Sequence, residues 1–102
     1  APFAMLVTLL ESDPYLGRIL TGKVYSGKAK VNSPVKVMNL AGEVLETGRL
    51  TKLLSFQGIK RTPTEEVVAG DIVSIAGLVE ATVANTIGAP ELDAPIPSIP
   101  ID

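Results

Sequence analysis

Cysteine and histidine are both missing from the sequence, and their absence removes several kinds of site. Without these side chains the chain can form neither disulfide bonds nor the thiolate and imidazole ligand sets that zinc usually takes. Cysteine nucleophiles and histidine-based acid–base catalysis are excluded for the same reason. Tryptophan is absent too, and two tyrosines and two phenylalanines are the only aromatic residues. We therefore expect a core built mainly from Val, Leu and Ile.

Long apolar runs are also missing. The longest falls well short of the roughly 18 consecutive apolar residues that indicate a membrane-spanning helix. The chain opens with APFAMLVTLL, without the basic segment that begins a secretion signal. We expect a cytoplasmic location and no membrane partner. The length of 102 residues, with 46% hydrophobic and 20% charged residues, suits one folded domain.

Short apolar runs separated by turn residues predict an all-β domain. Gly48 indicates a bulge or bend within one long run, and residues 58–64 are expected to form a loop. No segment shows sustained helical periodicity. Several runs are apolar on both faces, which indicates a sheet that closes on itself or is covered by a neighbour. The expected strands are 3–10, 17–26, 35–37, 44–56, a strand within 65–78 entered through a turn at 69–71, and 83–87; a hairpin tip is expected at 39–42.

The end of the chain differs in composition from the rest. Residues 88–102 read GAPELDAPIPSIPID and hold four of the eight prolines. Proline has no N–H for a sheet hydrogen bond and has a fixed φ, so such a segment favours an extended conformation. We therefore expect a β-barrel domain over residues 1–89 and a proline-rich linker toward a following domain over 90–102.

The stretch GKVYSGKA, residues 22–29, matches the first seven positions of the phosphate-loop pattern G-x-x-x-x-G-K-[ST]. The pattern fails at Ala29, which cannot supply the hydroxyl that holds Mg²⁺. A phosphate loop also needs a helix after it, whereas Pro34 would interrupt a helix here after about one turn. The surrounding pattern is that of strands. We interpret Gly22 as a close-packing or bend position and Gly27 as a turn residue.

Evidence for other chemistry is thin. Glu65, Glu66 and Asp71 could act as paired carboxylates, but their position at a predicted strand start favours surface charge and a turn cap. The serines have no histidine to activate them. Tyr15 and Tyr25 could stack on nucleobases, although a single tyrosine on a strand more often packs against its neighbours. We therefore do not expect an enzyme.

Charge is distributed unevenly along the chain. Residues 1–61 hold all nine basic residues and four acidic ones, a net charge of +5. Residues 62–102 hold seven acidic residues and no basic one. Such asymmetry favours an anionic partner for one face. The alternative is that opposite charges are interleaved once the chain folds.

Three stretches resemble the second domain of translational GTPases: YLGRILTGKVYSGKAK (15–30), LTKLLSFQGIKR (50–61) and EEVVAGDIVSIAGL (65–78). Together with the opening PFAMLVT, their order and spacing are most similar to the TypA/BipA branch, whereas elongation factor G and LepA share only the general plan. The resemblance covers residues 2–90, and the proline-rich tail is similar to the link into that family's next domain.

The resemblance implies a closed, six-stranded antiparallel β-barrel of the translation elongation factor domain 2 type. In that family the barrel follows a GTP-hydrolysing domain, so GTP and Mg²⁺ are expected there. This chain has neither a working phosphate loop nor D-x-x-G or N-K-x-D motifs in context, and we expect no cofactor in it. It also departs from the family near its end, where Ala84-Asn85-Thr86-Ile87 replaces the usual Gly-Asp-Thr-Ile. We expect the local turn to differ and the fold to be kept.

The resemblance also implies partners. The family's barrel contributes to ribosome binding through small-subunit rRNA and packs against its own GTPase domain; the isolated domain is expected to be a monomer. Phosphates attract Lys and Arg side chains without reading sequence. The candidate rRNA contacts are Lys28, Lys30, Lys60 and Arg61 in predicted turns and loops, and Arg18, Lys23 and Lys52 on predicted strands. Two alternatives stay open: a purely structural spacer, and an unrelated β-barrel module that binds a small ligand or peptide strand.

Overall fold

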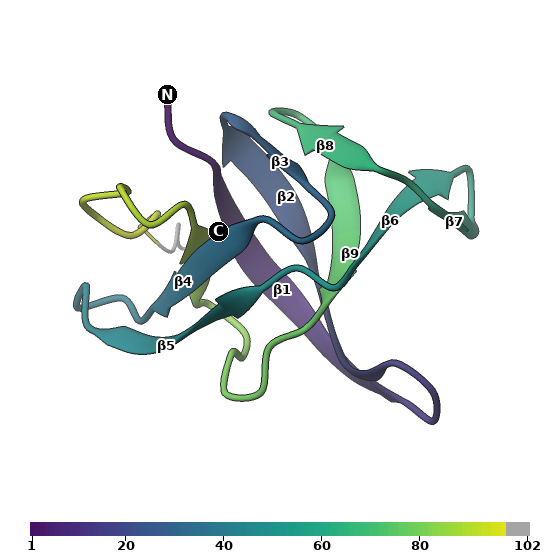
Figure 1. Ribbon diagram of the computed structural model, residues 1–102, viewed down its shortest axis with the longest axis horizontal. Coiled ribbons are helices and arrows are strands. Elements are labelled where there is room, and N and C mark those ends of the chain that lie inside the picture. The colour runs from purple at the N-terminus through teal and green to yellow at the C-terminus, as the bar shows by residue number, and fades with distance from the viewer. Residues whose placement is uncertain (98–102) are drawn as a thin grey trace, which may run out of the picture.

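Strands connected by turns form all the regular structure in residues 1–97, the part of the chain that the computed structural model describes (Figure 1). No helix in this part is long and apolar enough to cross a membrane. The predicted all-β class is therefore confirmed. The strands are β1 Ala4–Asp13, β2 Gly17–Ser26, β3 Lys28–Lys30, β4 Pro34–Met38, β5 Val44–Arg49, β6 Lys52–Gln57, β7 Lys60–Pro63, β8 Glu66–Val68, β9 Ile72–Ala76 and β10 Thr86–Gly88.

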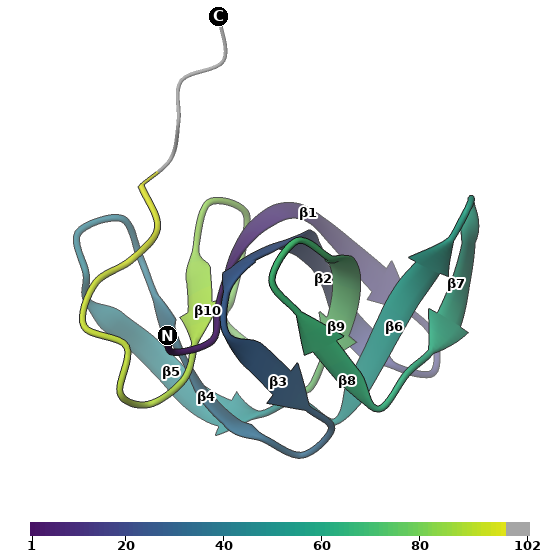
Figure 2. The ribbon, with the colours of Figure 1, turned by 90° about the horizontal axis from the view of Figure 1, so that it is seen from above.

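Eight of the strands form one antiparallel sheet in the order β5-β4-β10-β1-β2-β9-β6-β7, and β3 pairs with β8 in a second, two-stranded sheet. Seen from above, the strands curve around a common interior, as Figure 2 shows. The edge strands β5 and β7 are not paired with each other in the described residues. The arrangement thus keeps the expected barrel-like architecture as a curved open sheet, with more strands than the six predicted.

Several predicted strands agree with the structure, but the run 44–56 does not form one strand. It divides at Leu50 and Thr51, where the backbone changes partners: the Leu50 N–H donates to the carbonyl of Ser33 at 3.1 Å, and the Thr51 N–H donates to that of Ala76 at 2.9 Å. The chain therefore passes from one edge of the sheet to a strand near the other edge.

Of the bulge or bend predicted at Gly48, the bulge is wrong. Gly48 pairs in register with Val35, and the irregularity lies earlier in the hairpin. There, Val37 pairs with Glu46 and Met38 pairs with Val44, so one residue of β5 is left without a partner in register. The bulge therefore falls near the start of β5, where the sequence carries no glycine to mark it.

Residues 58–64, expected as a loop, contain β7. Gln57 pairs with Lys60, so the β6–β7 hairpin turns through two residues, Gly58 and Ile59. Gly58 has a φ of 66°, which glycine adopts without steric cost and which a two-residue hairpin commonly requires at its first position. The turn is therefore tight enough to let the residues after it pair with β6.

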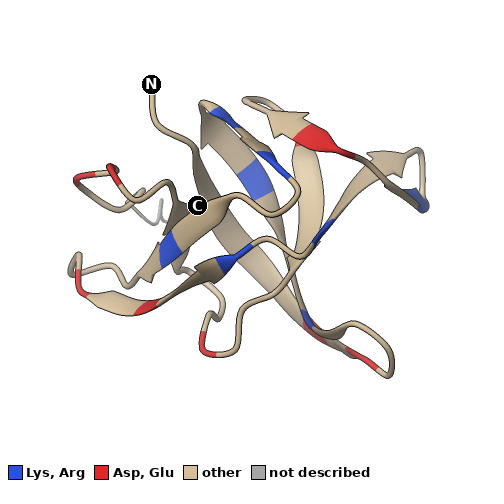
Figure 3. Ribbon diagram, in the orientation of Figure 1, with Lys and Arg blue, Asp and Glu red and all other residues tan. Residues whose placement is uncertain are grey.

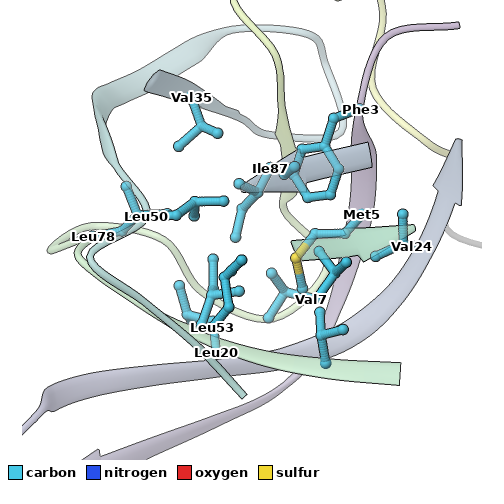
Figure 4. Packing of buried hydrophobic residues seen from close by; sticks show 14 of the residues in the cluster. Phe3, Met5, Val7, Leu20, Val24, Val35, Leu50, Leu53, Leu78 and Ile87 are labelled. Atoms are coloured by element: carbon cyan, nitrogen blue, oxygen red, sulfur yellow. The ribbon is translucent and has the colours of Figure 1, made fainter. Parts of the chain in front are cut away.

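The core lies inside the curved sheet and is almost entirely aliphatic, as expected from the composition (Figure 4). Phe3, just before β1, and Met5 and Val7 on β1 are all at most 4% exposed, which places this face in the interior. The largest fully buried side chains elsewhere come from the inner strands and the loops, and none comes from the edge strands β5 and β7. They include Leu20, Val24, Val37, Leu50, Leu53, Ile75 and Ile87.

The turn before β10 keeps a glycine-like backbone although it contains no glycine. Ala84 has a φ of 74°, in the left-handed region that side chains disfavour. Its N–H donates to the Val7 carbonyl at 2.9 Å, and the Val7 N–H donates to the Asn85 carbonyl at 3.0 Å. The Asn85 side chain accepts from the Thr82 N–H at 2.9 Å. The fold is kept, as expected, and these hydrogen bonds hold Ala84 in the strained conformation.

Residues after β10 lie against the domain. The Ala89 N–H donates to the Phe3 carbonyl at 2.9 Å, and the Ile96 N–H donates to the Thr86 hydroxyl at 2.8 Å. Leu92 packs close to Gly88. The segment is thus attached to the barrel through residue 96. The predicted linker 90–102 extends beyond the described residues, and its role as a connection stays a prediction.

Candidate nucleic-acid interface

The stretch that mimics a phosphate loop forms a strand running into a turn, as predicted. Gly22 lies within β2, where a Cβ atom would overlap the backbone carbonyl of Leu6. Gly27 has a φ of 66° and connects β2 directly to β3. Both glycines therefore have the structural roles expected of them. Residues 22–30 lack the strand–loop–helix arrangement that holds nucleotide phosphates.

Two candidate contacts, Lys28 and Lys30, lie on β3 on either side of a buried residue. Ala29 between them is 4% exposed, whereas both lysines are exposed. Strand alternation therefore directs the two lysine side chains away from the core. The Ser33 hydroxyl accepts from the Lys30 N–H at 3.0 Å, which fixes the turn into β4. Across the ladder, Lys30 pairs with Glu66 of β8.

Lys36 and Arg49 join this side of the molecule, although sequence reasoning did not single them out. In the β4–β5 ladder Pro34 pairs with Arg49, and Lys36 pairs with Thr47, so all four lie on the outer face of the hairpin. Arg49 Nη1 donates to the carbonyl of Asn32 at 2.9 Å, beside the turn that follows β3. The alternation of Lys36 with buried Val residues was the sequence signal for its outward position.

Lys23 and Lys52 lie on other strands. Lys23 is exposed on β2, with its Nζ 5.4 Å from the centre of the Tyr25 ring. Tyr25 is itself 46% exposed, so its ring combines an apolar surface with a neighbouring cation. Lys52 is half-buried at the start of β6. Lys60 is exposed at the start of β7, beside the tip of the β6–β7 hairpin.

The two remaining candidates, Arg18 and Arg61, make contacts within the domain. Arg18 Nε donates to the carbonyl of Ala81 at 2.7 Å. Arg61 forms an ion pair with Glu11 and lies 5.5 Å from the centre of the Phe56 ring. Each side chain is therefore engaged by its own protein. Arg18 is also half-buried and Arg61 is neutralised by a carboxylate, which distinguishes both from the exposed lysines Lys28, Lys30 and Lys60.

Figure 3 shows how charge is arranged on the folded domain, in the orientation of Figure 1. Many basic residues occupy β2, β3, β4 and the end of β5, near the middle of this view, while others lie on β6, on β7 at the right-hand side and beside acidic residues in the β1–β2 hairpin. Acidic residues lie mainly toward the periphery, on hairpin tips, loops and β8. The charges are therefore partly segregated rather than evenly interleaved.

The carboxylates considered for chemistry have structural positions. Asp71 Oδ2 accepts from the Val68 N–H at 2.9 Å, which supports the interpretation of a turn cap. Glu65 and Glu66 are exposed. In the part of the chain that is described, no three metal-ligating side chains gather closely enough to hold an ion. The basic surface is therefore the feature with a plausible binding chemistry.

Comparison with known proteins matches residues 17–88 to the family model of elongation factor Tu domain 2. The chain is 38% identical over 101 residues to the Large ribosomal subunit assembly factor BipA of Bacillus subtilis (strain 168), an alignment covering 99% of this chain and 16% of that protein. The BipA protein of Haemophilus influenzae (strain ATCC 51907 / DSM 11121 / KW20 / Rd) is 34% identical, with 100% and 16% covered. Elongation factor 2 of Methanoregula boonei (strain DSM 21154 / JCM 14090 / 6A8) is 36% identical over 86 residues, with 84% and 11% covered. The chain thus spans a small part of the length of these relatives.

Proposed function

The chain belongs to the elongation factor Tu domain 2 family and is of the TypA/BipA type, and from this premise we propose that it is a non-catalytic ribosome-binding domain of a cytoplasmic GTPase. Its proposed partners are the ribosome, through small-subunit rRNA, and the GTPase domain and following domain of the same protein. GTP and Mg²⁺ are assigned to the GTPase domain, because residues 22–30 form strands and a turn.

The observation that carries the proposal is the set of outward lysines. Lys28 and Lys30 are exposed and make no side-chain hydrogen bond or ion pair among residues 1–97. Such side chains can reach RNA phosphates and release the counterions condensed on them. Phosphate contacts of this kind orient a protein on RNA without reading its sequence. They suit a domain that positions a larger factor on the ribosome.

The test is ribosome binding by the full-length protein that contains this chain, compared with its Lys28→Gln/Lys30→Gln variant. We expect weaker binding of the variant and a slope of log affinity against log salt that is shallower by about 1.4, at about 0.7 per lost contact. The difference in affinity between the two proteins narrows as salt rises. The parent releases more counterions on binding, so its affinity falls more steeply with salt than that of the variant.

A triple variant of exposed acidic residues, Glu65→Gln/Glu66→Gln/Glu91→Gln, serves as the control and should retain the parent slope. Unchanged affinity of the lysine variant would overturn the RNA contact and favour the structural-spacer alternative. Binding to isolated 50S but not 30S subunits would overturn the assignment to small-subunit RNA. The name of the BipA relatives refers to the large subunit, so binding to the two isolated subunits is compared directly.

Packing against the GTPase domain is the second part of the proposal, and an exposed apolar group supports it. Tyr25, Val68 and Ile72 are 43% to 49% exposed and come from β2, β8 and β9. Ile72 pairs with Lys23, the neighbour of Tyr25 on the same face of β2. Contiguous apolar surface of this kind commonly marks a contact with another domain or protein.

The Val68→Ser/Ile72→Ser variant of the full-length protein tests this part. Loss of the interdomain contact should make proteolysis between the domains faster while ribosome-binding lysines are untouched. The Leu40→Ser/Leu45→Ser variant, which removes exposed apolar side chains from the β4–β5 hairpin, is the control. Equal proteolysis of the two variants would overturn the proposed packing surface.

A further inference from the structure

A groove runs along the outer side of β3, β4 and β5, bounded by the segment that follows β10. One part of it, with a volume of about 440 Å³, lies on the β4–β5 hairpin and is lined by Lys36, Thr47, Arg49 and Pro90, among others. A second part, of about 220 Å³, is lined by Lys28, Pro90 and their neighbours. Both parts share Pro34, Val35 and Pro90, so they adjoin.

The groove continues past β3. A third part, of about 490 Å³, shares Phe3, Lys28, Ala89 and Glu91 with the second. It extends to Val68 and Ala69, at the turn after β8. The three hollows thus adjoin one another in a row from β5 to β8, where they meet the surface proposed to pack against the GTPase domain. We call them together the Lys28–Arg49 groove after residues in their lining, and a row of adjoining hollows fits a chain better than it fits a compact ligand.

Three cations line this groove. Lys36 and Arg49 lie on the outer face of the β4–β5 hairpin, and Lys28 lines the parts beside β3. Arg49 already gives one N–H to the Asn32 carbonyl, which holds its guanidinium beside the groove. Glu91 is the one acidic residue in the lining of the three parts. The positive excess therefore lies in the part on the β4–β5 hairpin, whereas Glu91 balances Lys28 in the other two parts.

The floor between the cations is apolar and short of hydrogen-bond donors. Pro34 and Pro90 lie where the first two parts meet, and proline has no backbone N–H. The groove therefore offers few hydrogen bonds to a polar group at this point. The cations on either side can attract a chain that carries regularly spaced anions. This combination suits a nucleic-acid backbone, whose phosphates recur and whose sugars are less polar.

We propose that a single strand of RNA backbone lies in the Lys28–Arg49 groove, with its phosphates bound by Lys28, Lys36 and Arg49. This inference rests on the proposed function and places its RNA contact in one groove. It adds Lys36 and Arg49 to the contact surface. It also removes Lys52 and Lys60, which lie on β6 and β7, from that surface.

Two double variants of the full-length protein test the proposal. Lys28→Gln/Lys36→Gln removes two groove cations that make no side-chain hydrogen bond among residues 1–97, so its fold should persist. Lys52→Gln/Lys60→Gln removes the same charge elsewhere. For ribosome binding, we expect the groove variant to flatten the salt slope by about 1.4, at about 0.7 per contact, and the control to keep the parent slope.

The opposite result, with only the control variant affected, would overturn the groove and leave the proposed rRNA contact standing. If neither variant changes the slope, both the groove and the lysine contacts of the proposed function are overturned. Arg49 is tested separately by Arg49→Lys, which keeps the charge. It should keep the parent salt slope if charge is what matters at this position.

A photo-crosslinking residue at Thr47, which is exposed in the groove lining, identifies the occupant on the ribosome. Crosslinks to rRNA are expected from this position. The same residue at Ile59, the fully exposed tip of the β6–β7 hairpin, serves as the control and should give fewer rRNA crosslinks. Crosslinks from Thr47 to ribosomal protein alone would overturn the proposal in favour of an acidic polypeptide segment.

Discussion

Glu11 and Arg61 form an ion pair that joins the β1–β2 hairpin to the β6–β7 hairpin, across 50 residues of sequence. The two strands that carry these residues are not neighbours in the sheet order, since β2, β9 and β6 lie between them. The pair therefore joins the edge strand β7 to the central strand β1. It also explains why Arg61 is a poor candidate for RNA contact, because a carboxylate already neutralises it.

A double-mutant cycle with Glu11→Ala and Arg61→Ala should give a small coupling energy. The two side chains are 39% and 33% exposed, and pairs of this kind contribute about 0.2–1 kcal/mol. The coupling should fall further in about 1 M salt, where charges are screened within about 3 Å. Urea unfolding of the four proteins measures it. A coupling well above about 1 kcal/mol would show that the pair is a main determinant of closure between the hairpins.

A second long-range contact fixes the loop after β9. The Glu46 carboxylate accepts hydrogen bonds from the backbone N–H groups of Val79, Glu80 and Ala81, at 2.6–3.1 Å. Arg18 holds the same loop through the carbonyl of Ala81. Glu46→Ala should destabilise the domain by about 1–3 kcal/mol, because it leaves these donors without their acceptor. Amide exchange at residues 79–81 should increase more than elsewhere.

Glu46→Gln is the matched comparison for that variant. It keeps one acceptor oxygen and the shape of the side chain but removes the charge, so it should cost less than Glu46→Ala. Equal amide protection of residues 79–81 in all three proteins would contradict the role of Glu46. The loop would then be held by Arg18 and by packing of Leu78 alone.

Much of the fold could be predicted from the sequence because it is encoded locally. Alternation and turn residues located β2 at Gly17–Ser26 and the tip between β4 and β5. The errors occurred where a strand depends on a distant partner. β3 has three residues and exists through its pairing with β8, and the break at residues 50–51 follows from backbone hydrogen bonds to Ser33, before β4, and to Ala76 in β9. None of these partners is adjacent in the sequence to the residues that it pairs with.

The candidate site was predictable to a similar extent. Lys28 and Lys30 were expected to face outward because they follow a turn, and they do so in the structure through strand alternation around Ala29. What a side chain meets across the fold could not be predicted, because it is decided by the tertiary arrangement. Arg18 meets Ala81 across 63 residues of sequence, and it is this contact that separates it from the free lysines.

Ala84→Gly should stabilise the domain by about 0.5–1 kcal/mol. Ala84 has a φ of 74°, where an L-residue costs about 1–2 kcal/mol more than glycine, and part of this gain is offset by the greater freedom of glycine in the unfolded chain. Thermal unfolding measures the effect. Ala69→Gly, at an exposed turn position without positive φ, is the control and should destabilise by about 0.5–1 kcal/mol. A loss of stability in both variants would show that the backbone conformation of Ala84 does not strain the fold.

Gly22→Ala should be much more damaging than Gly58→Ala. An added Cβ at Gly22 would overlap backbone atoms of Leu6 in β1, which cannot move without disturbing the central ladder. We expect a loss of about 3 kcal/mol or failure to fold. At Gly58 the same Cβ meets nothing within 4 Å, so only the positive φ is penalised, by about 1 kcal/mol. Similar losses at both positions, measured by urea unfolding, would contradict the close packing of β1 and β2.

The stability of the β1–β2 hairpin turn should depend on pH, because the Asp13 carboxylate holds this turn. Its Oδ1 accepts from the N–H groups of Leu16 and Tyr15, at 2.9 and 2.7 Å, and these bonds hold the pKa of Asp13 below its ordinary value of 3.8, with a smaller contribution from the charge of Arg61. A carboxyl with a lowered folded-state pKa stabilises the fold above its unfolded pKa, and this stabilisation is lost as pH falls through the folded pKa.

The stability difference between the parent and Asp13→Asn should therefore be constant at neutral pH and shrink only below about pH 3.8. NMR titration of the Tyr15 and Leu16 amide shifts should give a midpoint below that value. Asp13→Ala, which removes the acceptor as well as the charge, should flatten both titrations and increase amide exchange at the tip. A midpoint at or above 3.8 in the parent would show that the two N–H groups do not favour the ionised carboxylate, and that the turn is held by its backbone alone.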